Sequence, residues 1–198
     1  MHMTSKEYDI VKEAYRFAEE AHKGQKRKGG TDIPYFTHIE ETASIVKTLT
    51  DKKEVIAAAF LHDVVEDCKK GDAKYTIKDI ENHFGPDVAK LVDFETENKY
   101  ESLPEHETWR KRKEETINHM KNAPLEAKMI ALGDKLSNMR SIKRDYEACG
   151  ERLWQRFNQK DKEQHGWYYR SMALGLSELK DTAAWQEFNN LVQEVFGE

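Results

Sequence analysis

Residues 55–67 read Val-Ile-Ala-Ala-Ala-Phe-Leu-His-Asp-Val-Val-Glu-Asp, and this stretch decides the fold class. The apolar run predicts a mostly buried helix. Ionisable side chains close the run, and burying them is costly unless something compensates their charge. A divalent metal would do so, because imidazole and carboxylate groups both bind transition ions. On a helix, His62 lies four residues from Glu66, and Asp63 lies four from Asp67, so these groups gather at one helix end.

Helical periodicity dominates the rest of the chain, and no sustained period-two pattern interrupts it. We therefore predict an all-α protein, with residues 1–198 forming a single helical bundle. A length of 198 residues suits one sizeable core. The expected helices cover about residues 37–49, 52–67 and 105–121, with short helices after Thr76 and from Pro86, a long helix after Pro124, and aromatic-rich helices near Leu153, Trp167 and Trp185.

The long helix after Pro124 carries two different faces. Its core stripe is expected to consist of Leu125, Met129, Leu132, Leu136 and Met139. Asp134, Asn138 and Ser141 stand at i, i+4 and i+7 on another face. Three polar residues on one helical face indicate a functional surface.

Bulk composition excludes several classes of protein. The formal net charge of −5 argues against a general nucleic-acid binder, whose surface would be basic. Two cysteines, Cys68 and Cys149, are too few for a disulfide framework and fit a reducing cytoplasm. The sequence has no apolar run near the roughly 20 residues of a membrane span.

Four residues form a candidate metal-ligand set. His62 and Asp63 are adjacent, so they can share a metal only if the end of their helix is tilted toward it. His38 lies at the start of an earlier helix, and Asp134 lies on the polar face of the long one. Two imidazoles and two carboxylates leave positions open for water and substrate, as in catalytic sites. Because histidine ligands must be neutral, metal affinity should fall below about pH 6.5, the unperturbed imidazole value.

Several motifs in this chain resemble those of one family, in the same order. The candidate ligand set is similar to the H…HD…D pattern of the HD superfamily of metal-dependent phosphohydrolases. Residues 21–29, Ala-His-Lys-Gly-Gln-Lys-Arg-Lys-Gly, resemble the opening motif of the hydrolase domain in Rel/SpoT alarmone proteins. Residues 61–67, 84–93 and 134–141 resemble later motifs of that domain, so the similarity covers roughly residues 14–144 and leaves C-terminal helices over 145–198.

The resemblance implies an enzyme that hydrolyses guanosine 3′,5′-bis(diphosphate) (ppGpp) and releases pyrophosphate from its 3′ position. It implies that the ligand set holds Mn²⁺, although other divalent transition metals suit the same donors. It also implies that Glu66 and Asp67 orient the attacking water and handle protons. The residues implied to contact substrate are Arg27, Lys28, Asn138 and Ser141. A guanidinium can bind a phosphate at two points, so Arg27 is not interchangeable with lysine.

Some features depart from the family pattern. Residues 31–33 lengthen the loop before Pro34, and Ile39 follows His38 where the family usually has proline. Residues 95–122 have no close match. No synthetase or TGS domain follows, so we expect a stand-alone small alarmone hydrolase. Two alternatives stay open, namely an HD phosphohydrolase for another nucleotide or phosphomonoester, and a non-catalytic nucleotide-binding module.

Overall fold

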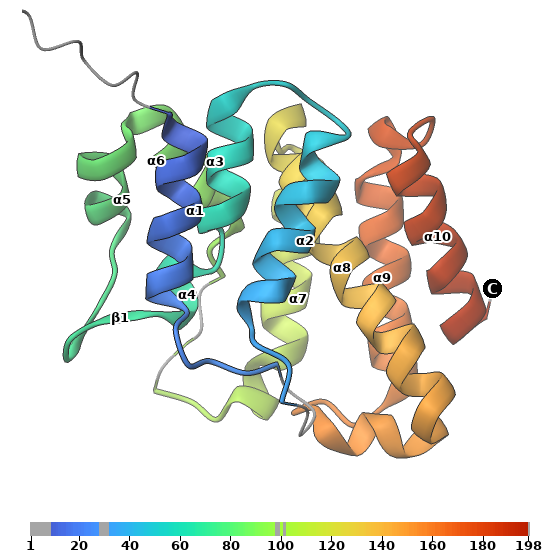
Figure 1. Cartoon of the computed structure of the whole chain (residues 1–198). Coiled ribbons are helices and arrows are strands. Elements are labelled where there is room, and N and C mark those ends of the chain that lie inside the picture. The colour runs from blue at the N-terminus through green and yellow to red at the C-terminus, as the bar shows by residue number, and fades with distance from the viewer. Residues whose placement is uncertain (1–8, 28–31, 98–99, 101, 198) are drawn as a thin grey trace, which may run out of the picture.

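Helix α8 (Leu125–Cys149) runs through the middle of a helical bundle (Figure 1). The computed structural model describes residues 9–27, 32–97, 100 and 102–197. On one side of α8 lie α1 (Ile10–Ala21), α2 (Phe36–Lys47), α3 (Lys53–Leu61), α4 (Val64–Asp67), α5 (Ile77–Phe84) and α6 (Pro86–Glu95). The remaining helices are α7 (Glu105–Lys121), α9 (Lys162–Gly175), α10 (Ala183–Phe196) and the 3₁₀ turns η1 (Gly150–Arg156) and η2 (Ser177–Leu179). The predicted all-α class is confirmed.

Local signals in the sequence account for the boundaries of α5 and α6. Thr76 caps α5 by accepting a hydrogen bond from the Asp79 backbone N–H, and the Asp79 side chain accepts one from the Thr76 backbone in return. Gly85 ends α5 with a φ of 87°, a conformation that glycine adopts without strain. Pro86 then opens α6, where its missing N–H leaves no bond unmade. These short-range signals are the reason that both helices were predictable.

The expected helix over residues 52–67 is interrupted, so that part of the prediction was wrong. Helix α3 ends at Leu61, residues 62 and 63 form a turn, and α4 begins at Val64. A small antiparallel hairpin follows that the sequence pattern did not predict, with β1 (Lys69–Lys70) paired to β2 (Ala73–Lys74). Gly71, with a φ of 64°, makes the tight turn between the two strands.

Two apolar clusters lie on either side of α8. Ile130 belongs to the cluster formed by α1, α2, α3, α5 and α6, whereas Leu136 belongs to the cluster formed with α9 and α10. Leu132, Leu136 and Met139 are fully buried, as predicted for the core stripe. Leu125 is 42% exposed, so its assignment to the core was wrong, because helical periodicity does not reveal where the neighbours of a helix end.

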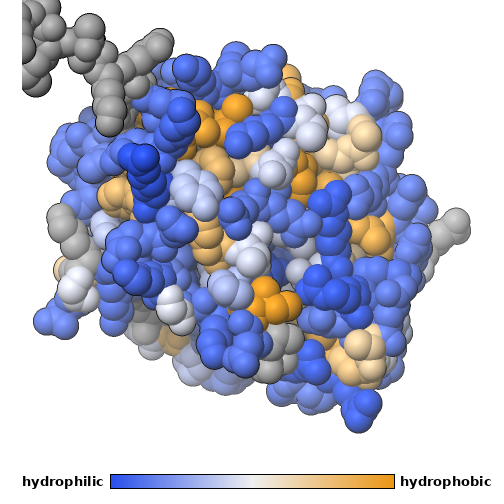
Figure 2. Space-filling view, viewed as in Figure 1, coloured by the Kyte–Doolittle hydropathy of each residue, from blue (hydrophilic) through white to orange (hydrophobic). Residues whose placement is uncertain are grey.

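The surface is mainly hydrophilic on the face seen in Figure 2, where apolar residues occur in small separate groups. This agrees with the mean hydropathy of −0.89. Among the described residues, none of the helices combines the length and the apolar character that crossing a membrane requires.

Candidate metal centre and active site

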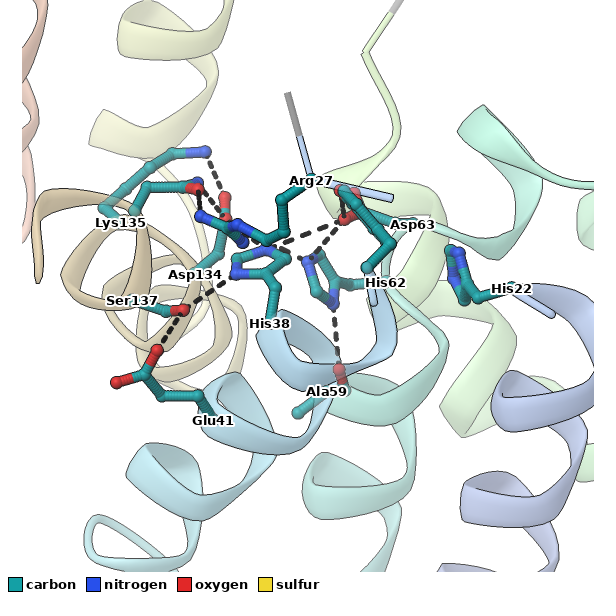
Figure 3. A network of polar contacts seen from close by, with 12 residues as sticks. His22, Arg27, His38, Glu41, Ala59, His62, Asp63, Asp134, Lys135 and Ser137 are labelled. Atoms are coloured by element: carbon teal, nitrogen blue, oxygen red, sulfur yellow. Dashed lines mark hydrogen bonds and ion pairs between the residues drawn. The ribbon is translucent and has the colours of Figure 1, made fainter. Parts of the chain in front are cut away.

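The turn between α3 and α4 directs two adjacent side chains to one place. His62 follows the last residue of α3, and Asp63 has φ −96° and ψ −3°, which interrupts the helix before Val64. Nδ1 of His62 donates to the carbonyl oxygen of Ala59 at 2.9 Å. The His62 ring is therefore fixed with its Nε2 atom directed at the carboxylates, as Figure 3 shows. The helix break supplies the tilt that a shared site for two sequential residues requires.

Three buried side chains converge at this point, from α2, from the turn after α3 and from α8. Ligand atoms of His38, His62 and Asp134 all lie within 4.8 Å of one another, a spacing that a single metal ion could bridge. Nε2 of His38 lies 3.2 Å from Oδ1 of Asp134, and Nε2 of His62 lies 4.0 Å from the same oxygen. Asp63 stands beside them, because its Oδ2 atom is 3.1 Å from Nε2 of His62 and 3.7 Å from Nε2 of His38. Tyr35 orients Asp63 by donating to Oδ2 at 2.6 Å.

The donor atoms fit a divalent transition metal. Nε2 of His62 is buried and has no hydrogen-bond partner among the described residues, although Oδ2 of Asp63 lies close by. Carboxylate oxygens of Asp63 and Asp134 lie 3.1 and 4.0 Å from this nitrogen. A buried polar atom without a partner is costly, and a cation there would satisfy it. Two imidazoles and a carboxylate are donors that such metals accept.

A chain of hydrogen bonds holds the imidazole of His38 in place. Nδ1 of His38 lies 2.8 Å from Oγ of Ser137, and that hydroxyl donates to Oε2 of Glu41 at 2.7 Å (Figure 3). Nη1 of Arg140 donates to Oε1 of Glu41 at 2.9 Å. Arg140 also makes a two-point contact with Glu187 of α10, at 2.6 Å for each bond. The support of His38 thus extends through α8 to the last helix.

Opposite charges in this cluster shift its pKa values. Burial alone would lower the pKa of His62, but the carboxylates of Asp63 and Asp134 outweigh burial and raise that pKa to about 10. Burial would raise the pKa of Asp134, but Lys135 and the two imidazoles hold it well below its ordinary value. Burial lowers the pKa of His38. The neighbouring carboxylates therefore favour the protonated form of His62, and burial favours the neutral form of His38.

A cavity of about 390 Å³ is lined by three of the candidate ligands, His62, Asp63 and Asp134. Glu66 and Asp67, the predicted acids, both line it from α4. Glu66 is partly buried and accepts a hydrogen bond from the backbone N–H of Glu97 at 3.2 Å, whereas Asp67 is exposed. The structure thus places both acids on the wall of a cavity that His62 and Asp134 also line.

Three of the predicted substrate-binding residues meet at one point on α8. Nη2 of Arg27 donates to Oδ1 of Asn138 at 3.2 Å and to Oγ of Ser141 at 3.0 Å. Nδ2 of Asn138 donates to Oδ1 of Asp134 at 2.6 Å. Asn138 therefore joins this polar group directly to the candidate metal centre. Lys28, the fourth residue, lies outside the described residues.

Sequence reasoning missed several residues of the cavity wall. Lys135 forms an ion pair with Asp134, and α7 contributes Arg112, Lys113 and Thr116 to the lining. The signal available was the basic run at residues 110–113. A basic run in a charged helix usually indicates a solvated face, and only tertiary contacts reveal that this one faces a cavity.

The chain is similar to proteins of known activity. The sequence profile of the HD domain matches residues 14–160. Guanosine-3′,5′-bis(diphosphate) 3′-pyrophosphohydrolase MESH1 of Xenopus tropicalis is 38% identical over 138 residues, covering 68% of this chain and 70% of that protein. Guanosine-3′,5′-bis(diphosphate) 3′-pyrophosphohydrolase of Vibrio cholerae is 32% identical over 147 residues, which cover 71% of this chain and 19% of that protein.

A solved structure shares the fold over the full length. The structure of a metazoan orthologue of SpoT, described as hydrolysing ppGpp and as playing a role in starvation responses, superimposes with a TM-score of 0.75 and 25% sequence identity. The superposition covers 100% of this chain and 99% of the other. These similarities agree with the arrangement of His38, His62 and Asp134. The profile match and the sequence identity show that this chain belongs to the HD-domain family.

Proposed function

We propose that this protein is a metal-dependent pyrophosphohydrolase that removes the 3′-diphosphate of ppGpp and releases GDP and pyrophosphate. The main support for this proposal is the pair of hydrogen bonds made by the Asn138 side chain. This side chain donates to Asp134 of the candidate metal centre and accepts from Arg27 of the predicted nucleotide contacts. One residue thus connects the two parts that such an enzyme needs. The named relatives are 3′-pyrophosphohydrolases of guanosine 3′,5′-bis(diphosphate), and the solved orthologue of SpoT hydrolyses ppGpp.

The ligands in this proposal are His38, His62, Asp63 and Asp134, and the metal is Mn²⁺. A divalent cation bound there would lower the pKa of a water molecule and polarise a phosphoryl oxygen. His38 and His62 offer Nε2 atoms, because their Nδ1 atoms are engaged by Ser137 and by the Ala59 carbonyl. Asp63 is the fourth ligand, and the Tyr35 hydroxyl orients its carboxylate by donating to Oδ2 at 2.6 Å.

Glu66 and Asp67 handle the protons of the reaction. Water attacks the phosphorus bonded to the 3′ oxygen, and one of the two carboxylates takes a proton from that water. The bond between phosphorus and the 3′ oxygen breaks, and the 3′ oxygen takes up a proton to become the hydroxyl of GDP. Arg27, Asn138 and Ser141 hold the nucleotide, and Lys28 joins them in this proposal. These roles are supported by the position of the two acids, which line the same cavity as His62, Asp63 and Asp134.

The proposal also covers the extent of the domain, the location of the protein and the class of its substrate. Residues 1–198 act as one HD-type domain, which is supported by the contribution of α8 to both apolar clusters. Cys68 and Cys149 are free thiols, which supports a cytoplasmic location. The substrate is a small nucleotide rather than a nucleic acid, in keeping with the net charge of −5.

Product analysis tests the proposal directly. Metal-stripped protein is incubated with ppGpp, with and without Mn²⁺, and GDP and pyrophosphate are quantified. We expect both products only with Mn²⁺, and loss of activity in Asp134→Asn. Asp93→Asn is the matched control, since Asp93 also lines the cavity but is not a proposed ligand. Turnover of other nucleotides or phosphomonoesters in preference to ppGpp would support the second enzyme class, and tight ppGpp binding without turnover would support a binding module.

A further inference from the structure

Glu97, just beyond the end of α6, makes a concentrated set of polar contacts with one face of α7. Its carboxylate accepts from Nζ of Lys113 at 3.0 Å and from the hydroxyl of Thr116 at 3.1 Å. It also accepts from the guanidinium of Arg112. A single carboxylate therefore lies against an ammonium, a guanidinium and a hydroxyl of one helix. The Thr116 hydroxyl also lies 3.0 Å from the carbonyl oxygen of Arg112, so two acceptors share its one proton.

These contacts lie at the wall of the active-site cavity and are mostly buried. The side chains of Arg112, Glu97 and Lys113 are 8%, 13% and 20% exposed. The cavity of about 390 Å³ and a neighbouring one of about 190 Å³ are both lined by these three residues and by Glu66 and Asp67. The donors on α7 thus lie next to the two proposed catalytic acids.

Two of the donors also have partners other than Glu97. Nε of Arg112 donates to Oγ1 of Thr108 at 3.3 Å, and its Nη2 donates to the carbonyl oxygen of Glu105 at 3.4 Å. Nζ of Lys113 lies 4.9 Å from the ring centre of Tyr168. A donor cluster held by its surroundings is prepared to bind an anion with little reorganisation.

The three donor types match a phosphate group. A guanidinium binds two oxygens at once, an ammonium adds a compact positive charge, and a hydroxyl donates a third bond. Burial would raise the pKa of Glu97, but Lys113 and Arg112 outweigh it and lower that pKa, so the carboxylate is an anion. Glu97 thus presents to these donors the charge and the oxygens that a phosphate would present.

We propose that Arg112, Lys113 and Thr116 form a subsite for the terminal phosphate of a diphosphate, and that the carboxylate of Glu97 occupies this subsite when no diphosphate is bound. The identity of the ligand as a diphosphate rests on the proposed function. Because the carboxylate and the phosphate need the same donors, Glu97 competes with the ligand. It weakens diphosphate binding and favours release of pyrophosphate.

Binding of inorganic pyrophosphate to the metal-loaded protein tests this, by calorimetry at a fixed concentration of free Mn²⁺. Glu97→Gln should bind pyrophosphate about tenfold more tightly, since the competing charge is gone. Glu115→Gln is the matched control, because Glu115 lines the same cavity but receives the Tyr100 hydroxyl and none of the three donors. Its affinity should change by less than about twofold, which separates competition from a general loss of negative charge.

A second pair of variants removes a donor. Lys113→Ala should weaken pyrophosphate binding about tenfold, and Glu97→Gln should add much less in that background than in the wild type. Lys111→Ala is the control on the same helix, since Lys111 lies over the Tyr100 ring instead of binding Glu97. Thermal unfolding of each variant verifies that the protein is folded.

Two results would overturn the subsite. One is an unchanged or weaker pyrophosphate affinity in folded Glu97→Gln, which would make Glu97 only an anchor between α6 and α7. The other is an equal gain in Glu97→Gln and Glu115→Gln. Failure of the proposed function is seen separately, as absence of ppGpp turnover by the wild-type protein, and does not affect the pyrophosphate measurement.

Discussion

The hydroxyl of Ser137 accepts a hydrogen bond from Nδ1 of His38 at 2.8 Å, which fixes the imidazole with its proton on Nδ1. The hydroxyl can only accept from this ring, because its own proton is donated to Glu41. Nε2 of His38 is then unprotonated and faces Asp134 and the other candidate ligands. Groups that orient a metal-binding histidine in this way raise its basicity and hold its ring in position.

Removing this hydroxyl should weaken metal binding. We expect Ser137→Ala to lower Mn²⁺ affinity about 10- to 100-fold, as is typical for loss of a hydrogen-bond partner of a histidine ligand. Thr42→Val is a matched control, since Thr42 is fully buried on the facing helix and its hydroxyl has no hydrogen-bond partner among the described residues. Direct titration of Mn²⁺ measures both. Equal losses in the two variants would mean that general packing, not the orientation of His38, sets the affinity.

Metal affinity should depend on pH over a higher range than the sequence suggested. Unperturbed imidazole predicts a fall below about pH 6.5. In the structure, the pKa of His62 is raised to about 10 by Asp63 and Asp134, so a metal must displace a proton from His62 at neutral pH. Apparent affinity should therefore rise about tenfold per pH unit between pH 7 and 9, as protonated His62 becomes rarer. Mn²⁺ titrations across that range, which would be flat if His62 were already neutral, provide the measurement.

The contact between α8 and α2 depends on Gly133. A Cβ atom at this position would lie 2.9 Å from the Thr42 carbonyl oxygen and 3.0 Å from Cγ2 of Val46. Gly133→Ala should force the two helices apart, lower the free energy of unfolding by about 1–3 kcal/mol and move Asp134 away from His38. Gly175→Ala is the comparison, because a Cβ there would meet only Met120 at 3.8 Å. Denaturant unfolding and Mn²⁺ affinity should both separate the two variants.

Arg27 should affect substrate binding without affecting the metal. Its guanidinium contacts Asn138 and Ser141 rather than a candidate ligand. We expect Arg27→Ala to raise the KM for ppGpp about tenfold or more, because the variant loses about one charge-assisted hydrogen bond to phosphate. Mn²⁺ affinity should be unchanged. Lys26→Ala serves as the control, since Lys26 pairs with Asp32 on the surface. A matching drop in metal affinity would place Arg27 in the structure of the metal centre instead.

The sequence was most informative where short-range chemistry decides the structure. Helix ends are set by the local preferences of Thr76, Asp79, Gly85 and Pro86. The structure confirms the two helices that these residues begin or end. The turn at residues 62 and 63 was missed, because an apolar run followed by polar residues reads as one helix until its neighbours are known. Leu125 was misassigned for the same reason.

The candidate site was also predictable only in part. The residue types of His38, His62 and Asp134 predict metal chemistry, but only the packing of α2, α3 and α8 brings their ligand atoms together. The contacts of Glu97 with α7 could not be predicted, since acidic and basic residues in polar segments are usually solvated. Their importance follows from burial, which a single sequence does not contain.

The two-point contact between Arg140 and Glu187 has a consequence for how this protein can be divided. Glu187 lies in α10, beyond the residues 14–160 that match the family profile. A fragment trimmed to the matched region would keep His38, Ser137 and Glu41 but lose the partner that holds Arg140 against Glu41. The shared catalytic pattern therefore ends earlier in the chain than the structure that supports it, and the C-terminal helix belongs in any version of the protein used to study its metal.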